Sequence, residues 1–231
     1  MSARPHDIIY DLPLTQFDAG CPWSIFSIGQ LADVLGGGTP DTGVMDLWEP
    51  AEVPWATPTD ITGTDGNDIL TTERYISHAG LKQSTLVPEN SLLMTSRATI
   101  GEAKINRVPM AINQGFAALC PKEGQSAEYL FYLLDILRPT FIRLGAGTTF
   151  LETSRREIRK VLLRVPDAGE QQRIVTALNL ADDACQAARA ELDATRELKR
   201  SLMASVFENG LSPNVSKMPC KIHRCFTASV P

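Results

Sequence analysis

The feature that most constrains this chain is a long stretch, from about Gly169 to Phe207, that no proline or further glycine interrupts. Pro166 fixes the entry, and the spacing of Asp167 and Glu170 is typical of a helix start. The pair Asn209-Gly210 supplies residue types that end helices. We therefore predict one continuous helix, which at a rise of 1.5 Å per residue would be roughly 55 to 60 Å long.

Apolar and small residues recur along this stretch at spacings of four and three, close to the seam of a coiled coil. The predicted seam consists of Ile174, Leu178, Ala181, Cys185, Ala188, Leu192, Thr195, Leu198, Leu202 and Val206. A helix of this length cannot bury its whole apolar stripe against the preceding domain alone. Two interpretations stay open: a terminal helix lying partly on its own domain, or a seam for a partner helix, which we favour.

The residues before this helix alternate short apolar stretches with turn-rich loops, the pattern of an α+β (mixed α/β) domain. The strand candidates are 91–95, 104–108, 115–120 and 161–165. One helix should run from the cap Ser126 to about Leu137, where Arg138-Pro139 stops it, and Ser154 should open a short basic helix. The chain therefore reads as a domain (1–165), a long coiled-coil helix (166–210) and a disordered tail (211–231).

The net charge of −5 argues at first against a nucleic-acid partner. That total conceals a split, because residues 1–73 carry a balance of −11 and residues 74–169 a balance of +5. A segmental asymmetry of this size indicates an electrostatic working face. No apolar run is long enough for a membrane helix and no secretion signal is visible, so we expect a cytoplasmic protein that uses its scattered cysteines in reduced form.

The motifs of the common catalytic sites are missing from the sequence, including a phosphate-binding loop, a nucleophile elbow and a zinc-protease helix. The least poor match is Pro40-Asp41 followed by Glu102-Ala103-Lys104, which loosely resembles a metal-dependent nuclease. Cys220, His223 and Cys225 in the tail lack a fourth ligand, so we expect no metal site. A non-catalytic function fits better.

Nucleic-acid contact has better support. Seven basic residues lie between Arg138 and Arg164, close to a small-residue loop at 145–149 that would let backbone N–H groups approach phosphates. Further upstream stand side chains of the types that read base edges. They are Arg97, Lys104, Arg107, Asn113 and Gln114. A solvated basic helix face explains 155–160 almost as well, and Asn113-Gln114 could equally be a satisfied turn.

The order of several motifs resembles a type I restriction-modification specificity subunit. In sequence order they are Gly37-Gly38-Thr39-Pro40, Trp48, Val53-Pro54-Trp55 with Asp60, TTERYISHAG (71–80), RATIG (97–101), Asn113-Gln114 and Gly147-Thr148-Thr149. The stretch from Val165-Pro166-Asp167 through Glu170-Gln171-Gln172-Arg173-Ile174 into the long helix is similar to that family's spacer helix. The similarity covers roughly residues 20–210.

This resemblance implies one target-recognition domain followed by one spacer helix, whereas full family members carry this unit twice. The chain would then be a half-subunit that pairs with a second copy through its helix, or a truncated product. The residues expected to contact double-stranded DNA are Gly38, Thr39, Arg97, Thr99, Lys104, Arg107, Asn113, Gln114, Arg143, Gly147, Thr148, Thr149, Arg155 and Arg156.

The resemblance also implies partners. Methyltransferase (M) and restriction (R) subunits would bring S-adenosylmethionine, ATP and magnesium, while this chain binds no cofactor itself. Two alternatives stay open: an inactive remnant or decoy that binds partner subunits through its helix without reading DNA, and the metal-dependent nuclease.

Overall fold

The computed structural model describes residues 23–146 and 152–210, and the chain divides into two compact units between Ala177 and Leu178. The first unit contains the strands β1 (Ser24–Ser27), β2 (Ala32–Gly36), β3 (Val53–Ala56), β4 (Asp68–Ile69), β5 (Arg74–Ile76), β6 (Thr85–Val87), β7 (Ser91–Thr95), β8 (Ala103–Asn106), β9 (Met110–Ile112), β10 (Phe116–Pro121) and β11 (Leu162–Val165). Its helical segments are α1 (Ile28–Leu31), η2 (Met45–Leu47), α2 (Pro58–Gly63), η3 (Gly80–Gln83), α3 (Ala127–Gly145), α4 (Arg155–Lys160) and the start of α5 (Ala168–Asn209). The predicted mixed α/β domain and long C-terminal helix are confirmed.

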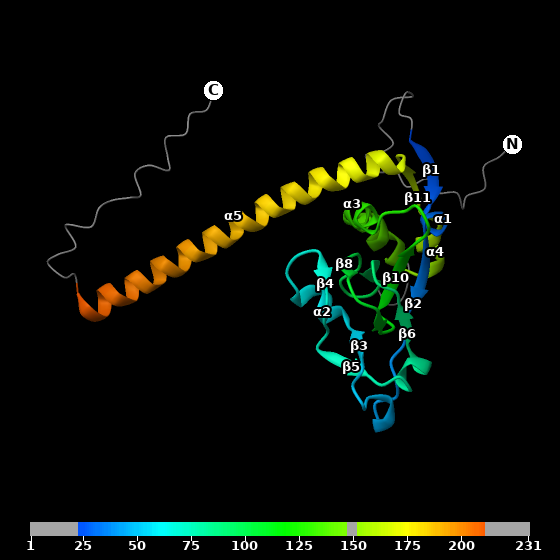
Figure 1. Cartoon of the computed structure of the whole chain (residues 1–231), viewed down its shortest axis with the longest axis horizontal. Helices are drawn as coiled ribbons and strands as arrows, with labels where there is room; N and C mark the ends of the chain where they lie inside the picture. Colours follow the sequence, from blue (N-terminus) through cyan, green and yellow to red (C-terminus); the bar gives the residue numbers. More distant parts are fainter. Residues whose placement is uncertain (1–22, 147–151, 211–231) are drawn as a thin grey trace. The chain divides into compact units, whose positions relative to one another are not determined.

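The strands form three sheets (Figure 1). A five-stranded sheet has the order β2-β10-β7-β8-β4, and a four-stranded sheet has the order β5-β3-β9-β6. A ribbon of β1 and β11 joins the start of the domain to the segment that leads into α5. Most neighbours pair antiparallel, while β4 with β8 and β3 with β9 pair parallel.

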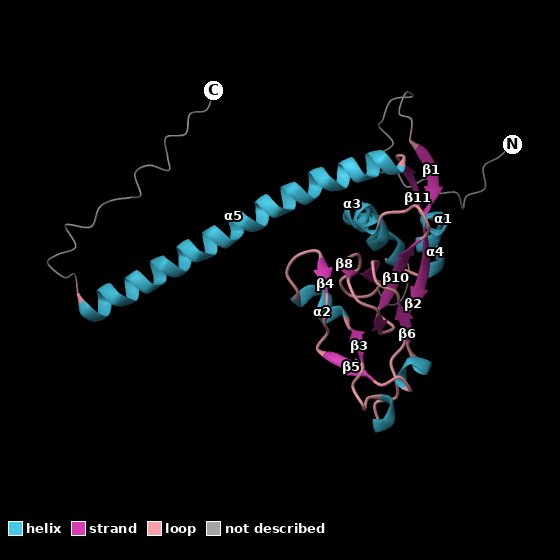
Figure 2. Ribbon diagram, in the orientation of Figure 1, coloured by secondary structure: helices cyan, strands magenta, loops and turns pink. Residues whose placement is uncertain are grey.

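Period-two alternation along the central strands explains how the sheets are layered. In β7, Leu92 and Met94 belong to a core shared with the helices, whereas Leu93 belongs to a second core shared with β9. The five-stranded sheet is therefore covered by α1, α3, α4 and the first turns of α5 on one face, and by the four-stranded sheet on the other. Figure 2 shows β3 and β5 on the far side of β8 and β10 from α3.

Helix α3 begins as the sequence predicts but ends later. The Ser126 hydroxyl accepts a hydrogen bond from the Tyr129 N–H at 3.1 Å, which is the expected cap. The prediction that Pro139 stops the helix is wrong, because α3 continues to Gly145. Continuation buries Phe141 completely, and the carbonyl that Pro139 leaves without a donor belongs to the exposed Asp135. The gain from burying Phe141 outweighs the loss of one backbone hydrogen bond.

The first turns of α5 belong to the domain. Asp167 Oδ1 accepts from the Glu170 N–H at 2.9 Å, so the predicted helix start is confirmed. Val175 is buried in the main core and Ile174 packs against it. Ile174, which the spacing pattern assigned to the seam, therefore packs against the domain core instead.

The second unit continues α5 from Leu178 to Asn209. Gly210 follows with a φ of 69°, and its N–H donates to the Val206 carbonyl at 2.9 Å, which caps the helix end. Exposed pairs such as Asp193 with Arg196 and Glu197 with Arg200 line this part. The remaining seam residues are exposed, apart from the partly exposed Val206, so no described residue of this unit covers the seam. Within the described part of the chain, no helix is both long and apolar enough to cross a membrane.

Candidate nucleic-acid interface

The loop that follows β2 packs directly against the turn between β9 and β10. The Gly38 N–H donates to the Ile112 carbonyl at 3.0 Å, and the Thr39 hydroxyl donates to the Gln114 side-chain oxygen. A Cβ added to Gly37 would lie 2.1 Å from the Ile112 carbonyl oxygen, so this approach requires glycine. The structure thus brings Gly38 and Thr39 together with Gln114, and Thr39 and Gln114 are 75 residues apart in the sequence.

Asn113 has a role in the local turn. Its side-chain oxygen accepts from the Gly115 N–H at 2.8 Å, which is the satisfied-turn interpretation that the sequence left open. Asn113 is only partly exposed, whereas the next residue, Gln114, is exposed. Of the two amides, Gln114 is therefore the better placed to meet a ligand.

Helix α4 brings arginines to the same end of the five-stranded sheet. The Ser154 hydroxyl accepts from the Glu157 N–H at 3.2 Å, so the predicted cap is confirmed. Arg159 donates to the Val34 carbonyl, which fixes α4 along β2. The Arg155 guanidinium lies over Gly36, where an added Cβ would come within 2.3 Å of it. Arg155 therefore adjoins the Gly37–Thr39 loop.

Two backbone hydrogen bonds of Ser96 place Arg97 close to the turn before β10 and to the start of α4. The Ser96 N–H donates to the Gly115 carbonyl at 2.8 Å, and the Ser96 carbonyl accepts from the Thr153 N–H at 3.0 Å. Arg97 follows Ser96, and its Nε lies 3.0 Å from a carboxylate oxygen of Glu152. The charge of Arg97 is thus partly balanced, whereas no described carboxylate lies within 4.0 Å of Arg155. We call 36–39, 113–115, 96–97 and 152–156 the basic end of the sheet.

Thr99 and Arg143 lie near the basic end. Thr99 is exposed, and its carbonyl accepts from the Thr95 hydroxyl at 2.6 Å. Arg143 is exposed in the last turn of α3, where the neighbouring Gly145 packs close to Glu152 and Thr153. Arg156 is exposed beside Arg155. Gly147, Thr148 and Thr149 lie outside the described residues.

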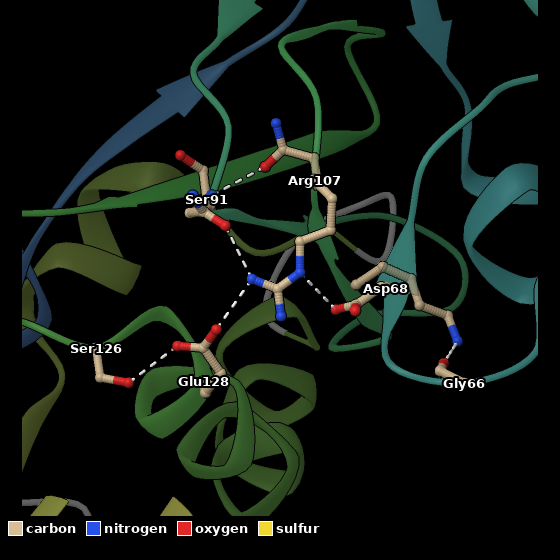
Figure 3. A network of polar contacts seen from close by, with 9 residues as sticks. Gly66, Asp68, Ser91, Arg107, Ser126 and Glu128 are labelled. Atoms are coloured by element: carbon tan, nitrogen blue, oxygen red, sulfur yellow. Dashed lines mark hydrogen bonds and ion pairs between the residues drawn. The ribbon is translucent and has the colours of Figure 1, made fainter. Parts of the chain in front are cut away.

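Arg107 lies at the other end of the sheet, in a network of its own (Figure 3). Asn106 pairs with Ser91 at the start of β7, so Arg107 is one strand length away from Arg97. Its guanidinium lies 3.0 Å from Asp68 and 2.9 Å from Glu128 in the first turn of α3. Burial lowers the pKa of Arg107, but hydrogen bonds to both carboxylates outweigh it and raise that pKa. We therefore assign Arg107 to the fold rather than to the interface.

The same network stabilises the charged form of Glu128. Burial acts to raise the pKa of Glu128, but the backbone hydrogen bond and Arg107 outweigh it, so the pKa is lowered. Lys104 also lies apart from the basic end, where its ammonium donates to the Gly66 carbonyl and burial lowers its pKa. Among the fourteen residues predicted to contact DNA, Lys104 and Arg107 are thus the two that the described structure places elsewhere.

One arrangement was missed by the sequence reasoning. The Arg74 guanidinium carbon lies 4.0 Å from the centre of the Trp48 ring and 5.1 Å from that of Trp55. The Trp55 indole N–H donates to the Gly38 carbonyl at 3.1 Å, which connects this cluster to the Gly37–Thr39 loop. Trp55 and Arg74 are cross-strand neighbours in β3 and β5, a pairing that only the register reveals.

The nuclease hypothesis gains nothing from the geometry. Glu102 forms an ion pair with Arg138 at 2.6 Å, and Asp41 accepts from the Gly43 N–H in a tight loop. Across residues 23–146 and 152–210, no group of three or more His, Cys, Asp or Glu side chains is arranged to hold a metal ion.

Residues 21–193 match the family model described as the type I restriction modification DNA specificity domain. The chain belongs to this family. It is 31% identical to the type I restriction enzyme MjaIX specificity subunit of Methanocaldococcus jannaschii, over 81% of this chain and 43% of the relative. A second relative, the EcoR124I/EcoR124II specificity subunit of Escherichia coli, is 27% identical over 68% of this chain and 40% of its own length.

Solved structures share the fold of this DNA specificity domain. The HsdS subunit from Thermoanaerobacter tengcongensis superposes with a TM-score of 0.63 at 22% identity, covering 87% of this chain and 48% of the other. The chain thus spans about half the length of the relatives that it matches.

Proposed function

We propose that this chain recognises double-stranded DNA and reads one half of a two-part site for a type I restriction-modification assembly, without catalysing a reaction itself. The family model is named for DNA specificity, and the named relatives are specificity subunits of restriction enzymes. The observation that carries the proposal is the basic end of the sheet, where Thr39 contacts Gln114 and Arg155 lies over the nearby Gly36, although these segments are distant in the sequence.

The chemistry of the basic end suits a duplex. Arg155 and Arg156 are exposed cations that can approach phosphates, while Thr39 and Gln114 offer the hydroxyl and amide groups that read base edges. Glycines at 36–38 let this loop pack directly against the Arg155 side chain and against the Ile112 and Gln83 carbonyls, which holds Thr39 beside Gln114. Acidic residues of the segment 1–73 would face away from DNA or toward partner subunits.

Charge reversal tests this placement. Arg155→Glu should weaken the binding of a mixed-sequence duplex of about 30 bp, and it should reduce the slope of log affinity against log salt by about 1. Lys122→Glu is the matched control, because it makes the same charge change at the opposite end of β10. Fluorescence anisotropy of the full chain between about 50 and 200 mM salt measures both. Equal affinity and slope in the two variants would contradict the proposal.

The exposed seam of α5 supports a second copy of this chain as partner. Two identical readers related by a two-fold axis would address inverted half-sites, because protein symmetry is mirrored in site symmetry. A cytoplasmic location stays an expectation.

The proposed assembly also contains methyltransferase and restriction subunits, which would bind S-adenosylmethionine, ATP and magnesium. Co-purification of the full chain with methyltransferase subunits, followed by mapping of the methylated sites, tests this part. Methylation of a defined two-part sequence is the expected result. A complex that forms but methylates without sequence preference would favour the decoy alternative.

A further inference from the structure

The strongest feature that the proposed interface leaves unused is the cluster of Arg74, Trp48 and Trp55. Arg74 in β5 pairs with Trp55 in β3, so both side chains stand on one face of the four-stranded sheet. The two indole rings meet edge to face, with centres 5.3 Å apart and an interplanar angle of 87°. The Arg74 guanidinium lies against both rings, closer to Trp48.

Both indole rings are held in place by hydrogen bonds to backbone. Trp48 donates to the Asp41 carbonyl at 3.0 Å, and Trp55 donates to the Gly38 carbonyl at 3.1 Å. Trp55 is buried, with 3% of its surface exposed, while Arg74 itself is exposed. A guanidinium supported on fixed rings loses much of its rotational freedom before any ligand arrives, and the N–H donors in its plane stay available.

No described carboxylate neutralises the charge of Arg74. Among the described residues, Arg97, Arg107 and Arg138 each have a carboxylate within 4.0 Å, and Arg74 has none. The rings explain why an arginine is tolerated there without an acid, since the faces of tryptophan carry partial negative charge. They do not use its hydrogen-bond donors.

The cluster adjoins the basic end of the sheet. The Trp55 indole donates a hydrogen bond to the Gly38 carbonyl, and the hydroxyl of the next residue, Thr39, donates one to the Gln114 side chain. A single indole ring therefore separates the Arg74 guanidinium from the loop that presents Thr39. This extends the exposed donors from the five-stranded sheet onto the four-stranded sheet.

We propose that Arg74 contacts DNA and that Trp48 and Trp55 orient it for this purpose; the inference rests on the proposed DNA recognition. The guanidinium would donate two parallel hydrogen bonds to a pair of acceptors on the duplex. Two features offer that geometry: the N7 and O6 atoms of a guanine edge, and two oxygens of a phosphate. Trp48 and Trp55 act as positioning residues.

Two DNA probes distinguish a guanine contact from a phosphate contact. One is a duplex that the wild-type full chain selects from a pool with a random core, and the other is a mixed-sequence duplex of about 30 bp. The variants are Arg74→Lys, which keeps the charge and loses the planar fork, and Arg74→Ala. Arg173→Lys, at another exposed arginine without a described carboxylate partner, is the matched control. Thermal unfolding of each variant shows that it is folded.

A guanine contact predicts that Arg74→Lys weakens binding of the selected duplex by about 5- to 100-fold and relaxes preference at one base pair, with little change on the mixed duplex. A phosphate contact predicts that Arg74→Ala weakens both duplexes equally and lowers the salt slope by about 1, while Arg74→Lys retains most binding. In either case Trp48→Leu should give part of the Arg74→Ala loss, because the guanidinium loses its support.

Binding of both duplexes by Arg74→Ala with wild-type affinity, slope and base preference would overturn the inference and leave DNA recognition intact. A folded wild-type chain that selects no duplex from the pool and does not bind the mixed-sequence duplex at low salt would instead overturn the proposed function, and this inference with it.

Discussion

Replacing Gly37 by alanine tests the close approach that builds the proposed interface. The new Cβ would lie 2.1 Å from the Ile112 carbonyl oxygen and 2.3 Å from the Asn113 carbonyl oxygen. Both are backbone atoms at the junction of β9 with its turn, so neither can rotate away. The loop must retreat by roughly 1 Å, and the bond from the Gly38 N–H to Ile112 is lost or lengthened.

The cost can be worked from these contacts. Overpacking of this kind costs about 1 to 3 kcal/mol, and a lost backbone hydrogen bond costs about 1 kcal/mol more. The lower entropy of the unfolded alanine chain returns about 0.4 to 1 kcal/mol. We therefore expect Gly37→Ala to lower the free energy of unfolding by about 1 to 3.5 kcal/mol and to weaken DNA binding, because Thr39 separates from Gln114.

Urea unfolding of the full chain, followed by circular dichroism, measures this loss, and Gly63→Ala is the matched control. Gly63 is the last residue of α2, and an added Cβ there meets no atom within 4 Å. Gly63→Ala should be neutral or slightly stabilising, by up to about 1 kcal/mol. Equal stability of wild type and Gly37→Ala would refute the reasoning.

Three further predictions concern the seam, the ion-pair network and the core. Aspartate at Leu178 and Leu192 should reduce the sedimentation mass of a dimer to that of a monomer, and an unchanged mass would rule out the seam. The pKa of Glu128 is lowered from 4.5 in the folded protein, so its contribution to the free energy of unfolding should be complete above pH 4.5 and should be lost as the pH falls through the lowered pKa. In acid unfolding, Glu128→Gln should therefore make the free energy of unfolding depend less on pH. Phe141→Ala should cost about 3 to 5 kcal/mol in urea unfolding, because the ring is fully buried; a loss below 1 kcal/mol would contradict this.

Local signals in the sequence predicted the helices α3, α4 and α5 but not α1 and α2, and they predicted the sheets only in part. Caps at Ser126, Ser154 and Asp167 fixed three helix starts, and β7 matches the predicted 91–95. The strands of the four-stranded sheet were missed because they have only three or four residues, too short for alternation to show. The end of α3 was misplaced because Phe141 is buried by tertiary contacts that override the local effect of Pro139.

The sequence also predicted the proposed interface only in part. Motif order indicated Thr39 and Gln114, and the basic cluster between Arg138 and Arg164 indicated Arg155; the structure bonds Thr39 to Gln114 by a hydrogen bond and places Arg155 beside Gly36 in the same region. Residue type alone could not separate Arg107, which two carboxylates neutralise, from Arg74, which has no ion-pair partner among the described residues. Such pairing joins segments far apart in the chain and leaves no local pattern in the sequence. A balance of +5 in residues 74–169 therefore overstates the charge available for DNA, since Arg107 and Lys122 pair with Asp68 and Asp33, which lie outside that segment.

The most direct test of the account is selection from a pool of duplexes with a random core, using the full chain together with methyltransferase subunits. DNA recognition through the basic end predicts a defined sequence for the wild type. Arg155→Glu should reduce retention sharply, while Lys122→Glu should select the same sequence with wild-type yield. Recovery of no preferred sequence by a folded wild-type assembly would contradict the central claim.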